Sequence, residues 1–163
     1  MIKQNFYIVN VNPLYEILYE IKDNLSFNIE NYITEDLFLK ESDLDLKKLY
    51  FRKDRVDTPK CKLEKKAIKK GMAWCDDPKH KKYNEEIKVY TKNNRESFYR
   101  DDNKYNYIIS ISHNHRKVPN KGSAIFIHLT DNYKPTAGCI ALRKKDFEIL
   151  LKLIDKKTKI KID

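Results

Sequence analysis

The stretch GSAIFIHLTDNYKPTAGCIAL, residues 122–142, contains the strongest structural signal of the chain. It begins with an apolar run that ends at His128, and it continues into a loop that places Cys139 in Thr-Ala-Gly-Cys. The run over residues 122–129 predicts a strand, and KYNYIISISHN, residues 104–114, predicts another. A polar turn that contains a proline joins the two runs. The sequence therefore predicts two neighbouring strands of one antiparallel sheet.

The segments around this pair predict a mostly β chain with one clear helix, an α+β fold. In KKDFEILLKLIDKK, residues 144–157, four apolar side chains share the spacing of one helix face: Phe147, Leu150, Leu151 and Ile154. The segments at residues 47–56 and 158–162 read as strands, and residues 75–87 read as a loop. In the first 45 residues, two tyrosine-rich apolar runs fit either strands or short helices, because their periodicity does not separate the two.

Length and composition set the class of protein. A chain of 163 residues is long enough to bury the core of one domain. The three cysteines are an odd number without a CxxC pair, so they predict at least one free thiol and no zinc site. As given, the sequence has no run of apolar residues long enough to span a bilayer and no signal-peptide pattern. Cys61 and Cys75 have no histidine at metal-ligand spacing, so we expect no metal site there.

Charge is distributed unevenly along the chain. The net charge is +10 and there are 11 tyrosines, which suits an anionic partner such as nucleic acid, a membrane surface or a bacterial cell wall. Residues 1–45 contain 3 lysines and 9 acidic residues, a balance of −6, so residues 46–163 carry +16. This break predicts a boundary between an acidic N-terminal segment, 1–45, and a basic domain, 46–163.

Cys139 and His128 are the candidate catalytic residues. Acyl transfer through a thiol needs a cysteine at a turn whose backbone N–H groups face the substrate carbonyl, and a histidine that takes its proton. Gly138 supplies the turn, Thr136 is expected to orient the histidine or hold the loop, and the following helix is expected to favour a thiolate. From residue types and spacing alone, a packed thiol and an ordinary histidine remain the commoner reading.

Residues 122–142 resemble the signature of the L,D-transpeptidase catalytic domain of bacterial cell-wall enzymes, in which a strand ending in His precedes a loop with [Ser/Thr]-x-Gly-Cys. The chain is most similar to a short Thr-Ala-Gly-Cys subgroup. Four further segments resemble it in the same order: LYFRKDRV (49–56), MAWCDDPKHKKYN (72–84), ESFYRDDNKYNYIISISHN (96–114) and LLKLIDKKTKIKI (150–162). The resemblance implies a β-sandwich-like domain with a helix after the nucleophile loop.

The resemblance also implies a function. Cys139 would attack the carbonyl between the third and fourth residues of a peptidoglycan tetrapeptide stem, and His128 would act as its base and later its acid. Gly138 and the Cys139 N–H would receive the oxyanion, with Thr136 in support. An amine acceptor would give a 3→3 crosslink, and water would give carboxypeptidase activity. The implied protein is a monomer in the periplasm or cell wall that needs no metal and no organic cofactor, and no nucleic-acid partner is expected.

The chain departs from the family pattern at two places. Ala137 and Ala141 stand where many members have His before the Gly and Arg after the Cys, which affects substrate anchoring. The usual N-terminal segment, resembling Glu-Gly-Asp-x-x-Thr-Pro-x-Gly-x-Phe, has no counterpart in residues 1–45. We hypothesise that this part was replaced or diverged, leaving the sheet incomplete and activity impaired.

Further residues are predicted to line the substrate site: Trp74, Tyr83, Asn84, His113 and Ala137. His113 and His115 are expected to be solvent-facing turn residues, with His113 bordering the site. Asp76 and Asp77 are expected in a structural loop. Two alternatives stay open: an inactive relative that only binds peptidoglycan, and a basic nucleic-acid-binding module in which tyrosines stack on bases.

Overall fold

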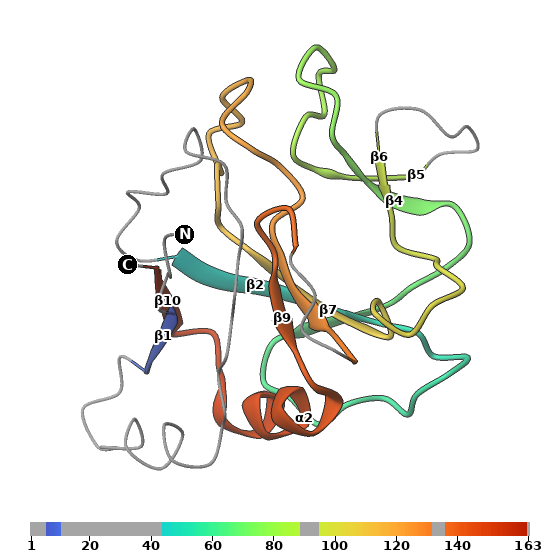
Figure 1. Ribbon diagram of the computed structural model, residues 1–163, viewed down its shortest axis with the longest axis vertical. Helices are drawn as coiled ribbons and strands as arrows, with labels where there is room; N and C mark the ends of the chain where they lie inside the picture. The colour runs from blue at the N-terminus through green and yellow to red at the C-terminus, as the bar shows by residue number, and fades with distance from the viewer. Residues whose placement is uncertain (1–5, 11–43, 89–94, 132–135, 163) are drawn as a thin grey trace.

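The computed structural model describes residues 6–10, 44–88, 95–131 and 136–162 (Figure 1). Ten strands and one helix fall in these ranges, with the helix late in the chain, so the expectation of a mostly β, α+β fold is confirmed. In chain order they are β1 (Phe6–Asn10), β2 (Leu44–Phe51), β3 (Glu64–Ala67), β4 (Met72–Cys75), β5 (Glu86–Lys88), β6 (Arg95–Ser97), β7 (Tyr107–Ile111), β8 (Phe126–Leu129), β9 (Ile140–Leu142), α2 (Lys144–Leu153) and β10 (Thr158–Ile162).

The strands form two sheets. The larger sheet has seven strands in the order β1-β10-β2-β7-β8-β9, with β3 paired to β2, and the smaller sheet has the order β5-β4-β6. β7 and β8 are antiparallel, which confirms the predicted pair. β8 and β9 are parallel neighbours, so both strands begin at the same end of the sheet.

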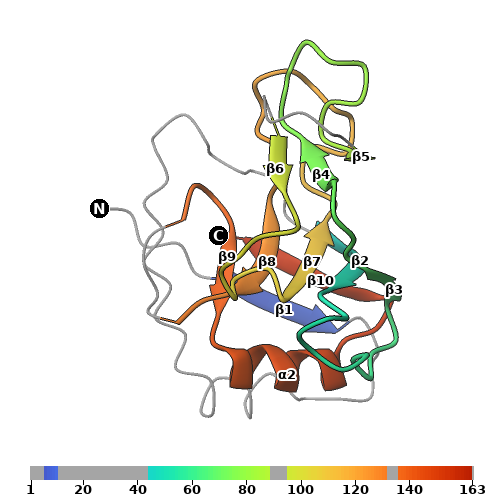
Figure 2. The same cartoon turned by 90° about the vertical axis from the view of Figure 1, so that its right-hand side faces the viewer.

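One face of the large sheet packs against α2 (Figure 2). The helix buries Phe147, Leu150 and Leu151, and Ile154 follows as its C-cap, so the predicted helix face is confirmed. These side chains meet strand residues that point to the same side, including Ile127 and Leu129 of β8. Burial of apolar surface from both layers supplies the main stabilisation here.

The opposite face of the large sheet carries an aromatic cluster. Phe126 of β8 and Ile108 of β7 point into it, and Phe98 reaches it from the chain just after β6 of the small sheet. Phe98 is fully buried, and its ring centroid lies 5.6 Å from that of Phe126. The cluster therefore joins the small sheet to the large one, on the side away from α2.

The N-terminal segment contributes to the large sheet. β1 pairs with β10 in antiparallel register from Phe6↔Ile162 to Asn10↔Thr158, so at least this part of the segment is a strand. β2 begins at Leu44, within the region of the predicted boundary. Residues 11–43, which hold the rest of the two apolar runs, lie outside the described residues, and the division at residue 45 stays a prediction.

Candidate active site

The parallel pairing of β8 with β9 brings His128 and Cys139 to the same face of the sheet. His128 is the register partner of Ala141, and Cys139 precedes Ala141 by two residues. Because side chains alternate between the two faces of a strand, residues 139 and 141 share a face with their neighbour His128. Cys139 packs against the aromatic cluster that also holds Phe126, two residues before His128. Cys139 and His128 thus lie on the same face of the sheet, and their pairing in catalysis stays a prediction.

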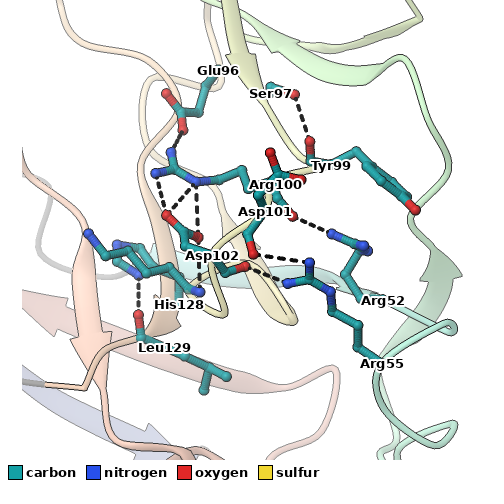
Figure 3. A network of polar contacts seen from close by, with 11 residues as sticks. Arg52, Arg55, Glu96, Ser97, Tyr99, Arg100, Asp101, Asp102, His128 and Leu129 are labelled. Atoms are coloured by element: carbon teal, nitrogen blue, oxygen red, sulfur yellow. Dashed lines mark hydrogen bonds and ion pairs between the residues drawn. The ribbon is translucent and has the colours of Figure 1, made fainter.

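The imidazole of His128 has one defined tautomer. The side chain is buried, and its Nδ1 lies 2.8 Å from the carbonyl oxygen of Leu129 (Figure 3). A carbonyl only accepts, so Nδ1 carries the proton and Nε2 keeps a free lone pair. Burial lowers the pKa of His128 below its ordinary value of 6.5, and nearby Lys104 and Arg100 act in the same direction. The ring is therefore a neutral base at neutral pH.

Cys139 is a protonated thiol at rest. Its Sγ donates to the carbonyl oxygen of Ala124 at 3.3 Å. Burial raises the pKa of the Cys139 thiol to about 11. The expectation that the following helix favours a thiolate is wrong: β9 separates Cys139 from α2, which begins at Lys144 and packs on the other face of the sheet. A helix N-terminus acts only over its first turn, so it does not reach this sulfur.

Thr136 and Gly138 define the backbone conformation just before Cys139. Gly138 has a φ of 107°, a conformation that side chains with a Cβ disfavour. Thr136 donates from Oγ1 to the carbonyl oxygen of Cys139 at 2.6 Å, so it holds the loop. The Leu129 carbonyl, and not this threonine, orients Nδ1 of the histidine. Ala137 is exposed beside Gly138.

A polar network lies beside His128 (Figure 3). The guanidinium of Arg100 pairs with Glu96 at 3.1 Å and with Asp102 at 2.7 Å. It also lies 4.9 Å from the ring centroid of Tyr105, whose ring is in turn 5.4 Å from that of His128. Burial raises the pKa of Tyr105, with Cys139 and Glu96 adding to the effect. Tyr105 therefore stays neutral, and its ring contacts both the Arg100 guanidinium and the His128 imidazole.

Sequence reasoning did not place Glu96, Arg100 or Tyr105 in a network beside His128. All three lie in or next to the segment 96–114, which carries the family resemblance, but their spacing gives no chemical signal of its own. Charge and aromatic character are common throughout this chain. Tyr105 lies beside the histidine because β7 pairs with β8, and Glu96 is carried by β6 of the small sheet.

The structure places the five residues predicted to contact substrate in different settings. Trp74 packs edge-on against Phe126 at 5.3 Å, and its Nε1 donates to Oδ1 of Asn84 at 2.8 Å. Tyr83 is buried. His113 is also buried and its Nε2 lies 2.9 Å from the Lys121 carbonyl oxygen, so the expectation of a solvent-facing His113 is wrong, whereas His115 is exposed. Contact of Trp74, Tyr83, Asn84, His113 or Ala137 with substrate stays a prediction.

A family model of the L,D-transpeptidase catalytic domain, YkuD, matches residues 46–162. The chain belongs to this family. Members of the YkuD family are in general cysteine-dependent acyltransferases, and the matched range contains both Cys139 and His128. Comparison with curated proteins gave no match, and neither did comparison with solved structures.

The described residues of this L,D-transpeptidase family member contain neither a metal-binding cluster nor a membrane-spanning helix. No group of three or more His, Cys, Asp or Glu side chains suited to a metal ion occurs among the described residues. Within the same residues, no helix has the length and hydropathy that crossing a membrane requires.

A pocket of about 640 Å³ lies on the α2 side, between residues 53–60 and the helix, away from Cys139.

Proposed function

We propose that this protein acts on peptidoglycan tetrapeptide stems through a thioester at Cys139, as an L,D-transpeptidase of the Thr-Ala-Gly-Cys subgroup or as an L,D-carboxypeptidase. The observation that carries the proposal is the common face of Cys139 and His128, with the free Nε2 lone pair set by the Nδ1 contact to Leu129. Its site of action would be the periplasm or cell wall, since members of the family are typically extracytoplasmic.

The first step forms the thioester. The Cys139 sulfur attacks the carbonyl carbon between the third and fourth stem residues while Nε2 of His128 takes the thiol proton. The tetrahedral oxyanion would be received by the backbone N–H of Cys139, with Gly138 allowing the close approach. Collapse breaks the peptide bond, and the imidazolium returns its proton to the departing D-alanine amine.

The second step releases the product. His128 removes a proton from the incoming nucleophile, which attacks the thioester carbonyl, and the Cys139 sulfur leaves and regains the proton. An amine from a neighbouring stem yields a 3→3 crosslink, and water yields a tripeptide. Both resting groups are neutral, so the proton must move from sulfur to nitrogen as the new bond forms.

Mass spectrometry of purified disaccharide-tetrapeptide incubated with the protein tests this proposal. We expect loss of D-alanine, with or without a 3→3 dimer, and no product from Cys139→Ala. The dimer identifies a transpeptidase, and the tripeptide alone identifies a carboxypeptidase. An unchanged substrate mass with folded protein would contradict the proposal and favour an inactive, wall-binding relative.

The pH dependence of the reaction follows from the two pKa shifts. Protonated His128 cannot accept the thiol proton, so kcat/KM is lost as pH falls through a pKa that burial holds below 6.5. On the alkaline side, the thiol pKa of about 11 predicts no loss through neutral and mildly alkaline pH. We expect D-alanine release, measured from about pH 4.5 to 9.5, to rise once and then stay level. An acid limb above pH 7 would contradict a buried neutral imidazole.

A further inference from the structure

The side chain of Asn84 forms four hydrogen bonds to two different parts of the fold. Its Oδ1 accepts from Nε1 of Trp74 at 2.8 Å and from the backbone N–H of Ala124 at 3.3 Å. Its Nδ2 donates to the carbonyl oxygens of His113 at 2.9 Å and Asn114 at 3.0 Å. Two acceptor and two donor positions are the full capacity of a carboxamide. Asn84 therefore joins the end of the small sheet to the segment between β7 and β8.

Ala124 lies next to the nucleophile and has an unusual backbone conformation. Its φ is 55°, in the left-handed region that alanine avoids. Such a conformation persists only where surrounding contacts hold it. Its carbonyl oxygen is the acceptor for the Cys139 thiol at 3.3 Å, while its N–H donates to Asn84. The same residue thus faces the nucleophile with one backbone group and the carboxamide with the other.

We propose that Asn84 is a positioning residue for the nucleophile: through the Ala124 N–H it sets the carbonyl that holds the Cys139 thiol proton away from His128 at rest. The inference rests on the proposed role of Cys139 and goes beyond a substrate contact for Asn84. Proton transfer to His128 then requires the S–H group to turn from Ala124 as substrate arrives. Asn84 controls how firmly the resting thiol is held.

Other contacts secure the same segment without reaching Ala124. Ser123 donates to Asp76, and Lys117 pairs with Glu85. Asn114 donates from Nδ2 to the carbonyl oxygens of Val118 and Gly122 at 2.9 and 2.8 Å. Asn114 also has a positive φ of 47°, so it resembles Asn84 in backbone conformation and residue type, and its carboxamide makes three hydrogen bonds against the four of Asn84. It offers a matched control within the same segment.

The test compares Asn84→Gly with Asn114→Gly, since glycine tolerates a positive φ at both positions. The first readout is alkylation of Cys139 by iodoacetamide at pH 8, followed at the peptide level to separate it from Cys61 and Cys75. A carbonyl acceptor favours the thiol over the thiolate, so its release should accelerate alkylation about fivefold in Asn84→Gly. Asn114→Gly should stay within about twofold of the unsubstituted protein. Glu96 and Tyr105, the charged and titratable groups that interact with the thiol, are the same in both variants.

A second readout is the infrared S–H stretch of Cys139 in a background with Cys61→Ala and Cys75→Ala. We expect it to move toward the frequency of a free thiol in Asn84→Gly only. Unchanged or slower alkylation and an unmoved band in folded Asn84→Gly would overturn the proposal, as would equal effects in both variants. If Asn84→Gly does not fold, Trp74→Phe removes one bond from the same carboxamide, and the absence of any acceleration there would overturn it. Neither readout needs peptidoglycan, so failure of the proposed function is detected separately.

Discussion

His128→Asn should lower kcat/KM for D-alanine release by about a thousandfold, within the range that general acid–base catalysis supplies. The asparagine amide resembles in shape the part of the imidazole ring that carries Nδ1. Its N–H can still donate to the Leu129 carbonyl in place of Nδ1–H. It has no basic nitrogen at the position of Nε2. Because the thiol pKa is about 11, almost no thiolate forms without a base to take the proton.

Steady-state kinetics of D-alanine release would measure this loss, with His115→Asn as the control. His115 is an exposed histidine in the segment after β7, and we expect its substitution to leave kcat/KM unchanged. Circular dichroism would establish that both variants are folded. A folded His128→Asn protein with less than about a tenfold loss would mean that another group takes the thiol proton.

The sequence correctly predicted the strands and the helix whose apolar residues follow a regular spacing. The apolar residues of 107–111 and 126–129 became β7 and β8, and the spacing of Phe147, Leu150 and Leu151 became the buried face of α2. Each of these depends on contacts that a strand or helix makes with one neighbouring layer. The sequence period reports such contacts directly.

Features that depend on long-range placement were not predictable in this way. The prediction that α2 favours a thiolate at Cys139 was wrong because β9, which pairs with β8, lies between Cys139 and the helix. The sequence alone did not show this strand. The prediction of a solvent-facing His113 was wrong because the side chain is buried and its Nε2 contacts the carbonyl oxygen of Lys121. Its position in a polar turn of the sequence gave no sign of this contact. The resemblance made Cys139 and His128 the candidates, but the groups that accept their hydrogen bonds are the backbone carbonyls of Ala124 and Leu129. Every residue has a backbone carbonyl, so residue types do not reveal which carbonyls take part in such contacts.

Phe98→Ala should lower the free energy of unfolding by about 3–5 kcal/mol, the usual cost of removing a buried aromatic side chain. Phe98 is fully buried between the two sheets, with ring centroids of Tyr50 at 4.9 Å and Phe126 at 5.6 Å. Its ring also lies 6.5 Å from that of Tyr105, which contacts His128. The cavity would therefore loosen the support of the histidine as well as the attachment of the small sheet.

Urea unfolding followed by Trp74 fluorescence would measure this loss, because Trp74 stacks on Phe98 at 6.2 Å and reports on the same cluster. Val118→Ala is the control: Val118 is 43% exposed, and its truncation should change stability by no more than about 0.5 kcal/mol. Domains of this size are stable by only about 5–15 kcal/mol, so Phe98→Ala would remove a large share of the total. A loss below about 1 kcal/mol would show that the small sheet is held to the large one mainly by polar contacts. In that case the active-site geometry would depend on ion pairs such as Arg100 with Glu96 more than on the aromatic cluster.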